Sequence, residues 1–180
     1  MPPNAREMTK MMSMLLIMEA LEKETLSLED EVDTANDEEH PTYKVIRNNK
    51  LKEGDEPLSN VIGLESQKKE LLLMIDWFNR SQELKNQGIV IPKGLILHGD
   101  MGNGKSLLIS EIIKCCNAPV YVYKGGTDNV TGDIQKIFDL ARKEPRAIVV
   151  FDEFDLLLNK DRRLIRVFQE NLDGLDTNGN

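Results

Sequence analysis

A glycine-rich run at residues 99–106 is the part of the sequence best suited to chemistry. It matches the pattern G-x-x-x-x-G-K-[ST] at every fixed position, follows the apolar residues 94–97 and precedes a helix-compatible segment, residues 107–116. In that setting the glycines let backbone N–H groups turn inward around phosphate oxygens, and the helix N-terminus adds positive potential. The run therefore predicts a cradle for a nucleoside triphosphate rather than a glycine-rich turn without a ligand.

The predicted phosphate contacts come from the whole run and the residue after it. Lys105 is expected to reach the β- and γ-phosphates, and the Ser106 hydroxyl is expected to hold Mg²⁺. The candidates are Gly99, Asp100, Met101, Gly102, Asn103, Gly104, Lys105, Ser106 and Leu107.

Two further candidates, Asp152 and Glu153, follow the continuous apolar run 147–151. Such a run is typical of a strand covered on both faces, and open parallel sheets bind ligands at the carboxyl ends of their strands. Asp152 is expected to hold the Mg²⁺ shell, and Glu153 is expected to orient and deprotonate the water that attacks the γ-phosphate. The alternative is that these acids, with Asp155, only begin a loop and cap the following helix.

Together these motifs resemble those of the AAA ATPases, most closely the proteases and unfoldases of that family. Residues 61–65 are similar to the family's entry motif, residues 91–97 to its lead-in to the phosphate loop, and residues 151–155 to its Walker B segment. Residues 172–176 are similar to the stretch before its fourth strand. The resemblance covers residues 57–180.

The resemblance implies an α/β fold of the P-loop NTPase type, with a parallel sheet and flanking helices, incomplete at the C-terminus. It implies ATP and Mg²⁺ as cofactors and self-association into a ring, because the family's arginine finger comes from a neighbouring subunit. The implied site has catalytic residues Glu153 and Lys105, metal ligands Ser106 and Asp152, and adenine contacts Ile62 and Gly63.

The elements that the family places next, a sensor-1 strand, an arginine finger and a helical lid, would follow Asn180. In the family the sensor-1 strand lies between the phosphate-loop strand and the Walker B strand. The strand at residues 94–98 is therefore expected to lack its usual neighbours. Either the two remaining strands pair directly, or the chain is a fragment completed from elsewhere, or it folds poorly. A truncated product is expected to bind ATP and hydrolyse it slowly on its own.

Upstream of this domain the sequence is acidic. The net charge of −8 lies in residues 1–40, with 3 Lys/Arg against 11 Asp/Glu, whereas residues 41–180 hold 20 of each sign. That balance does not suggest a nucleic-acid partner. Apolar residues spaced by three and four predict an amphipathic helix within residues 1–28, which could pack on the domain or dock on a protein partner. Residues 29–56 are expected to be an acidic and polar linker, and residues 57–180 the partial ATPase domain.

The remaining chain predicts alternating helices and strands: helices 65–80, 105–116, 132–143 and 161–172, and strands 94–98, 119–123 and 147–151. The apolar run 11–18 is too short to span a bilayer, which needs about 20 residues. The only cysteines, Cys115 and Cys116, are adjacent and are expected to be buried thiols in a reducing, cytoplasmic setting.

Two hypotheses of function follow. The first is an AAA-type ATPase that binds Mg-ATP and hydrolyses it in a complete oligomer. The second is a non-hydrolysing module that binds nucleotide or docks a partner.

Overall fold

The computed structural model describes residues 16–18, 38–47, 50–99, 103–125, 127–152 and 154–173. Its strands are β1 (Leu16–Met18), β2 (Glu38–His40), β3 (Tyr43–Ile46), β4 (Ile96–Leu97), β5 (Val120–Tyr123) and β6 (Ile148–Asp152). Its helices are α2 (Glu65–Asn79), α3 (Ser81–Asn86), α4 (Lys105–Cys115), α5 (Val130–Ala141), α6 (Phe154–Lys160) and α7 (Arg163–Asp173).

The strands form one mixed sheet in the order β2-β3-β5-β6-β1-β4. The four strands from β5 to β4 run parallel, and the β2–β3 hairpin adds to the β5 edge in the antiparallel direction. The carboxyl ends of β4, β5 and β6 therefore lie at the same edge of the sheet, which is where α4 and α5 begin.

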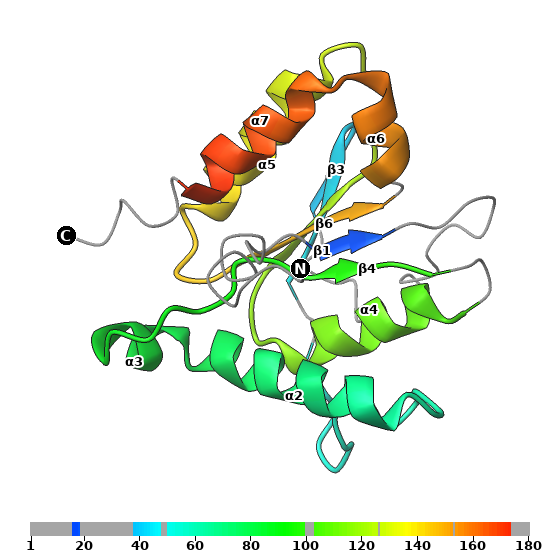
Figure 1. Ribbon diagram of the computed structural model, residues 1–180, viewed down its shortest axis with the longest axis vertical. Coiled ribbons are helices and arrows are strands. Elements are labelled where there is room, and N and C mark those ends of the chain that lie inside the picture. The colour runs from blue at the N-terminus through cyan, green and yellow to red at the C-terminus, as the bar shows by residue number, and fades with distance from the viewer. Residues whose placement is uncertain are drawn as a thin grey trace, which may run out of the picture.

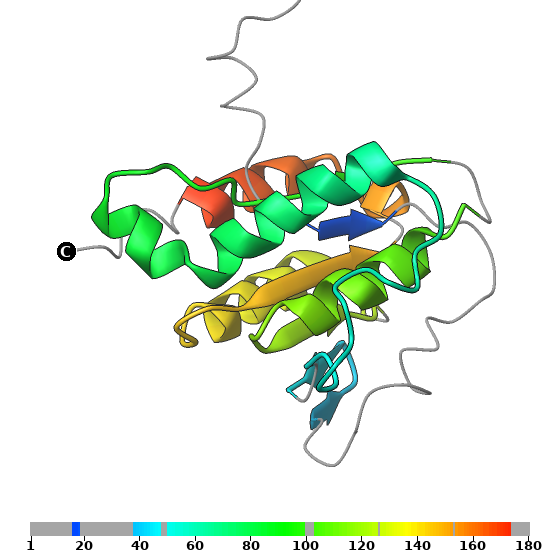
Figure 2. The same ribbon diagram turned by 90° about the horizontal axis from the view of Figure 1, so that it is seen from below.

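Helices cover both faces of the sheet, with α5, α6 and α7 on one face and α4 on the other (Figures 1 and 2). On the first face, the Phe151 ring of β6 packs against Phe138 and Phe168, with centroid distances of 6.0 and 4.9 Å. On the other face, Ile109 and Ile113 of α4 join the buried cluster around Val150. Helix α2 packs on the outer side of α4 (Figure 2), with Leu71 and Ile75 beside Leu108 and Ile112. A strand covered in this way needs apolar side chains on both faces, as β6 has.

The predicted α/β fold with a parallel sheet and flanking helices is confirmed. Every helix and strand expected between residues 65 and 173 is present, with ends that differ by a few residues. Helices α3 and α6 come in addition to those predicted. The two cysteines are free thiols, and burial raises the pKa of Cys116 to about 12.

The helix predicted within residues 1–28 is wrong at residues 16–18, which form strand β1. The rest of that prediction lies outside the described residues. Spacings of three and four fit an amphipathic helix, but a short unbroken apolar run also fits a strand covered on both faces. Strand β1 lies between β6 and β4, so β4 has a neighbour in the sheet that the sequence did not predict.

The linker predicted at residues 29–56 is wrong at residues 38–46, where β2 and β3 form a hairpin that joins the sheet. Val45 and Ile46 are fully buried, and the rings of His40 and Tyr43 stack with centroids 4.5 Å apart. The acidic composition of the segment predicted a linker, although Val45 and Ile46 of β3 pair with β5 and extend the sheet.

Within the described ranges, none of the helices has the length and apolar character that a membrane crossing requires.

Candidate functional site

The turn between β4 and α4 contains a backbone conformation that favours glycine. Gly104, the residue before α4, has φ 74° and ψ 19°, in the left-handed region. It supplies no side-chain cap to the helix, and its carbonyl oxygen accepts the first helical bond from the Leu108 N–H at 2.9 Å. Helix α4 therefore begins directly at the glycine-rich loop, with its positive end toward the loop.

Lys105 is the first residue of α4 and its side chain turns back over the loop. Its Nζ donates a hydrogen bond to the Gly99 carbonyl oxygen at 2.5 Å, and the residue is only 9 % exposed. The interaction joins Gly99 and Lys105, the two ends of the loop. It holds the ammonium group at the first residue of the loop, and contact of Lys105 with phosphate stays a prediction.

Asp152 is the last residue of β6 and is half-buried. The register places it at the same edge as the phosphate loop, because Met18 of β1 pairs with both Leu97 of β4 and Asp152 of β6. Adjacent strands lie about 4.8 Å apart, so the ends of β4 and β6 are separated by about 10 Å across the sheet. The fold thus brings the two predicted motifs, which are far apart in sequence, to one edge.

The structure describes part of the predicted site. It brings Gly99 and Lys105 together, and a Cβ on Gly99 would lie 3.9 Å from the Asn103 side-chain nitrogen. Ser106 lies in the first turn of α4 and is half-buried, while Leu107 is exposed. Four predicted residues lie outside the described ranges: Asp100, Met101, Gly102 and Glu153.

The predicted adenine contacts lie in the turn before α2. Ile62 is 96 % exposed and Gly63 has φ 81°. The neighbouring Val61 is buried against the cluster that contains Leu108 of α4, so this turn is anchored on the helix that begins at the phosphate loop. The placement is compatible with an adenine contact, which stays a prediction.

The oxygen donors at this edge suit a magnesium ion. Ser106 offers a hydroxyl and Asp152 a carboxylate, and Mg²⁺ binds through a few such oxygens while it keeps several waters. No group of three or more His, Cys, Asp or Glu that could hold a metal by itself occurs among the described residues. The donor set therefore fits a cation shared with a bound phosphate rather than one held by protein side chains alone.

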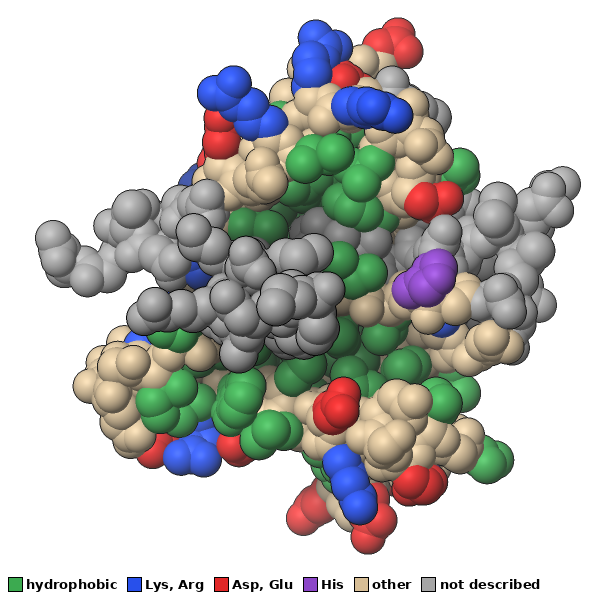
Figure 3. All heavy atoms as spheres, viewed as in Figure 1, with side chains coloured by type: hydrophobic (Ala, Val, Ile, Leu, Met, Phe, Trp, Pro, Cys, Tyr) green, Lys and Arg blue, Asp and Glu red, His purple; other side chains and the backbone are tan. Residues whose placement is uncertain are grey.

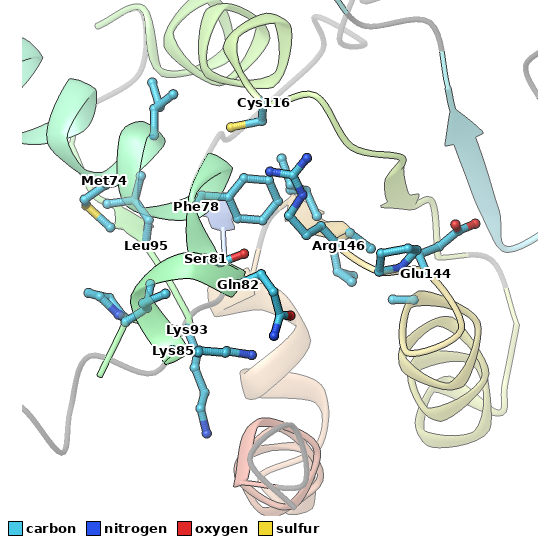
Figure 4. A pocket seen from close by; sticks show the side chains of 18 of the residues that line it. Met74, Phe78, Ser81, Gln82, Lys85, Lys93, Leu95, Cys116, Glu144 and Arg146 are labelled. Atoms are coloured by element: carbon cyan, nitrogen blue, oxygen red, sulfur yellow. The ribbon is translucent and has the colours of Figure 1, made fainter. Parts of the chain in front are cut away.

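A hollow of about 860 Å³ lies at the amino ends of the strands, opposite the ends that carry the phosphate loop (Figure 4). Its wall includes Leu95, which precedes β4, and Ile148, at the start of β6, with Phe78 and Arg146 facing one another from α2 and the segment before β6. The Arg146 guanidinium lies 5.9 Å from the centroid of the Phe78 ring. This hollow is at the amino ends of the strands, so it is separate from the phosphate loop.

Basic side chains over α6 and α7 lie beside acidic ones (Figure 3). Arg163 pairs with Asp161 at 2.8 Å and Arg166 with Glu170 at 2.7 Å. These pairs neutralise much of the local charge on α7. That nucleic acid is not a partner stays a prediction.

The sequence that forms this end of the sheet matches a known family. The sequence pattern described as "ATPase family associated with various cellular activities (AAA)" matches residues 95–180. That range contains both the phosphate loop and Asp152. The match indicates an ATP-binding function of the AAA type.

Several curated relatives carry the name ATP-dependent zinc metalloprotease FtsH. The protein from Ureaplasma parvum is 29% identical over 144 residues, which is 72% of this chain and 20% of the relative. That from Malacoplasma penetrans is 32% identical over 57% of this chain and 13% of the relative. FtsH 1 from Symbiobacterium thermophilum is 34% identical over 57% of this chain and 18% of the relative.

The chain thus spans a fifth or less of the length of these three relatives. The family match, by contrast, has a defined range that includes the phosphate loop and Asp152. Residues 95–180 therefore belong to the AAA family of ATPases.

Proposed function

We propose that this chain binds Mg-ATP at the edge formed by β4, α4 and β6, and that it hydrolyses ATP when assembled into a complete oligomer. The observation that carries the proposal is the Lys105 ammonium group, held over the glycine-rich loop at the N-terminus of α4 and at the same sheet edge as Asp152.

The phosphate chain is bound by the loop and by the start of α4. The Lys105 Nζ donates to a neutral carbonyl oxygen, Gly99 O, at 2.5 Å. An anionic phosphate oxygen is a stronger acceptor for an ammonium group, because attraction between opposite charges adds to the hydrogen bond. ATP therefore draws the ammonium group from the carbonyl to the β- and γ-phosphates, and the positive end of α4 adds to the attraction.

Ser106 and Asp152 would hold Mg²⁺, which when bound neutralises the charge that the phosphates develop. The Ser106 hydroxyl oxygen approaches from α4, which begins at this edge, and the Asp152 carboxylate from β6, which ends there. The distance between these two oxygens depends on how far apart the sheet holds the ends of β4 and β6.

Glu153, next to Asp152 in sequence, is the base of the proposed reaction. Its carboxylate accepts a hydrogen bond from the attacking water, orients it toward the γ-phosphate and takes its proton. Its structure lies outside the described residues, so its role rests on sequence. An arginine from a neighbouring subunit, implied by the family, is worth about 10³–10⁵ in rate in related NTPases, so we expect slow turnover by a single chain.

The proposal is confined to the ATP-dependent part of the relatives' names. The described residues contain no cluster of three metal-binding side chains, and the chain matches a fifth or less of each relative reported above. Proteolysis is therefore not proposed for these residues.

Phosphate release and nucleotide binding, measured on the same protein, test the proposal. The unaltered chain is expected to bind a fluorescent ATP analogue with Mg²⁺ and to release phosphate at a rate that rises with chain concentration. Glu153→Gln keeps the shape of the side chain without the base, so it should bind equally and release none. Glu170→Gln, an exposed acid on α7, is the matched control and should behave as the unaltered chain does.

Equal turnover by Glu153→Gln would exclude this residue as the base. Binding without turnover at any chain concentration would instead favour the non-hydrolysing nucleotide-binding module.

A further inference from the structure

Strand β1 is the described strand that connects the two nucleotide motifs. Its backbone pairs in parallel with β6 on one side, from Leu16 opposite Val150 to Met18 opposite Asp152. On the other side Ile17 pairs with Ile96 and Met18 with Leu97 of β4. One residue of β1, Met18, thus lies level with the last residues of both β4 and β6.

The two neighbours of β1 depend on it to different degrees. Strand β6 also pairs with β5 along four residues, from Ile148 to Phe151. Strand β4 has only two residues, and among the described strands its one partner is β1. Without β1, the packing of Leu95 and Leu97 against α4 would remain, but the described pairing of β4 with the sheet would be lost.

Loss of β1 changes the site in either of two ways. If the gap stays open, backbone groups of β4 and β6 lose their hydrogen-bond partners, which is costly where water cannot replace them. If the gap closes, β4 and β6 become neighbours and their ends approach by one strand spacing, about 4.8 Å. Both outcomes change the separation between the phosphate loop and Asp152.

Among the described strands, β1 has no hairpin partner, which makes it a separable element. Strand β2, the next described strand, lies at the far edge of the sheet, in first place in the order whereas β1 is in fifth. Residues 19–37, between them, lie outside the described ranges. A three-residue strand without a hairpin partner is the kind of unit that can leave a sheet while the rest stays folded.

We propose that β1 holds the phosphate loop after β4 and Asp152 of β6 at their working separation, so that docking of residues 16–18 and binding of ATP strengthen each other. The inference rests on the proposed function and adds a means of regulating the same site. Coupling is reciprocal: if docked β1 raises ATP affinity by some factor, ATP stabilises docked β1 by the same factor.

Amide hydrogen exchange of the unaltered chain tests this without any mutation. Saturating Mg-ATP is expected to slow exchange in residues 16–18 about tenfold, within the 5–150-fold range of typical coupling. The β2–β3 hairpin at the other edge of the sheet is the internal control and should show no comparable change. Unchanged exchange at residues 16–18 while ATP is bound would overturn the inference.

A pair of variants measures the same coupling through the effect of β1 on ATP affinity. Ile17→Pro removes a backbone N–H from a strand that has neighbours on both sides, so affinity for the fluorescent ATP analogue is expected to fall about tenfold. Ile17→Val keeps the N–H and a strand-forming side chain, and its affinity should stay within about twofold of the unaltered chain. Circular dichroism checks that both variants are folded.

The outcomes separate this inference from the proposed function. If the unaltered chain does not bind the nucleotide, the proposed function fails and the coupling fails with it. If it binds, and a folded Ile17→Pro chain binds equally well, only the coupling is overturned. If Ile17→Pro does not fold, the exchange experiment on the unaltered chain decides.

Discussion

Helices α4 and α5 both begin just after a strand of the same sheet, but their first turns are built differently. At α5 the Asn129 side chain accepts a hydrogen bond from the Gly132 N–H at 3.2 Å, and Thr127 bonds to Asp133 beside it. At α4 the residue before the helix is Gly104, which offers no side-chain cap, and the first helical residue is Lys105.

The difference separates a structural turn from a binding turn. In the first turn of α5 a backbone N–H group is bonded by a side chain of the same segment. This cap stabilises the helix and leaves fewer N–H groups for a ligand to bind. The first turn of α4 carries a cation and follows a glycine-rich sequence, with no side-chain cap on the helix. Changes at α4 should therefore affect ligand binding, and changes at α5 should affect only stability.

The largest effect is expected from Lys105→Ala, which removes the cation of the α4 turn. Hydrogen bonds to charged groups contribute about 1.5–3 kcal/mol, so the loss of two phosphate contacts should weaken ATP-analogue binding about a hundredfold or more. Lys136→Ala, on α5, is the matched control: its Nζ lies 3.1 Å from His40 Nε2 at the hairpin. Equal affinity of the Lys105 variant and the unaltered chain would contradict the assignment of the α4 turn.

A smaller effect is expected from Gly104→Ala. A Cβ there would meet nothing within 4 Å, so the cost comes from the left-handed backbone alone, about 1–2 kcal/mol. Affinity for the ATP analogue should fall by up to about tenfold, because a strained loop is harder to hold in the bound form. Calorimetric titration and thermal unfolding would show how the cost is divided between ATP affinity and the stability of the fold. No change in either quantity would mean that the loop does not need this conformation.

Asn129→Ala should act on stability only. Loss of the cap is expected to lower the free energy of unfolding by about 1 kcal/mol, while ATP affinity stays the same. Chemical denaturation and a binding titration on the same sample measure both. Weaker ATP binding in this variant would break the contrast between the two turns.

The smallest effect is expected from Gly132→Ala in α5. Alanine gains about 1 kcal/mol of helix propensity over glycine, but its Cβ would displace the Asn129 side chain and so lose a cap of similar worth. The two terms nearly cancel, and the denaturation midpoint should hardly move. A large loss of stability would show that the Asn129 side chain cannot move aside.

What could be predicted from the sequence depends on how local the signal is. The phosphate loop and α4 were predicted because the glycines, Lys105 and the following helix are contiguous. Strand β6 was predicted because both its faces are covered, which produces an unbroken apolar run ending in Asp152. The helix at 132–143 was placed two residues late, since Asn129 is the cap and Val130 the first helical residue.

The elements that could not be predicted depend on partners distant in the chain. Strand β1 lies beside β4 and β6, more than 70 residues away in sequence, and its apolar run also fits the period of a helix. The β2–β3 hairpin was hidden because Lys44 and Arg47 flank Val45 and Ile46 and a run of acidic residues precedes them. Its place at the sheet edge follows from pairing with β5, which local composition does not encode. The connection of the two nucleotide motifs through Met18 was missed for the same reason.

The central claim is that the α4 turn is a nucleotide-binding turn, and calorimetric titration of the folded chain with Mg-ATP tests it most directly. We predict saturable binding of one nucleotide per chain that is lost in Lys105→Ala and kept in Asn129→Ala. A chain that is folded by circular dichroism and yet takes up no Mg-ATP would contradict the claim.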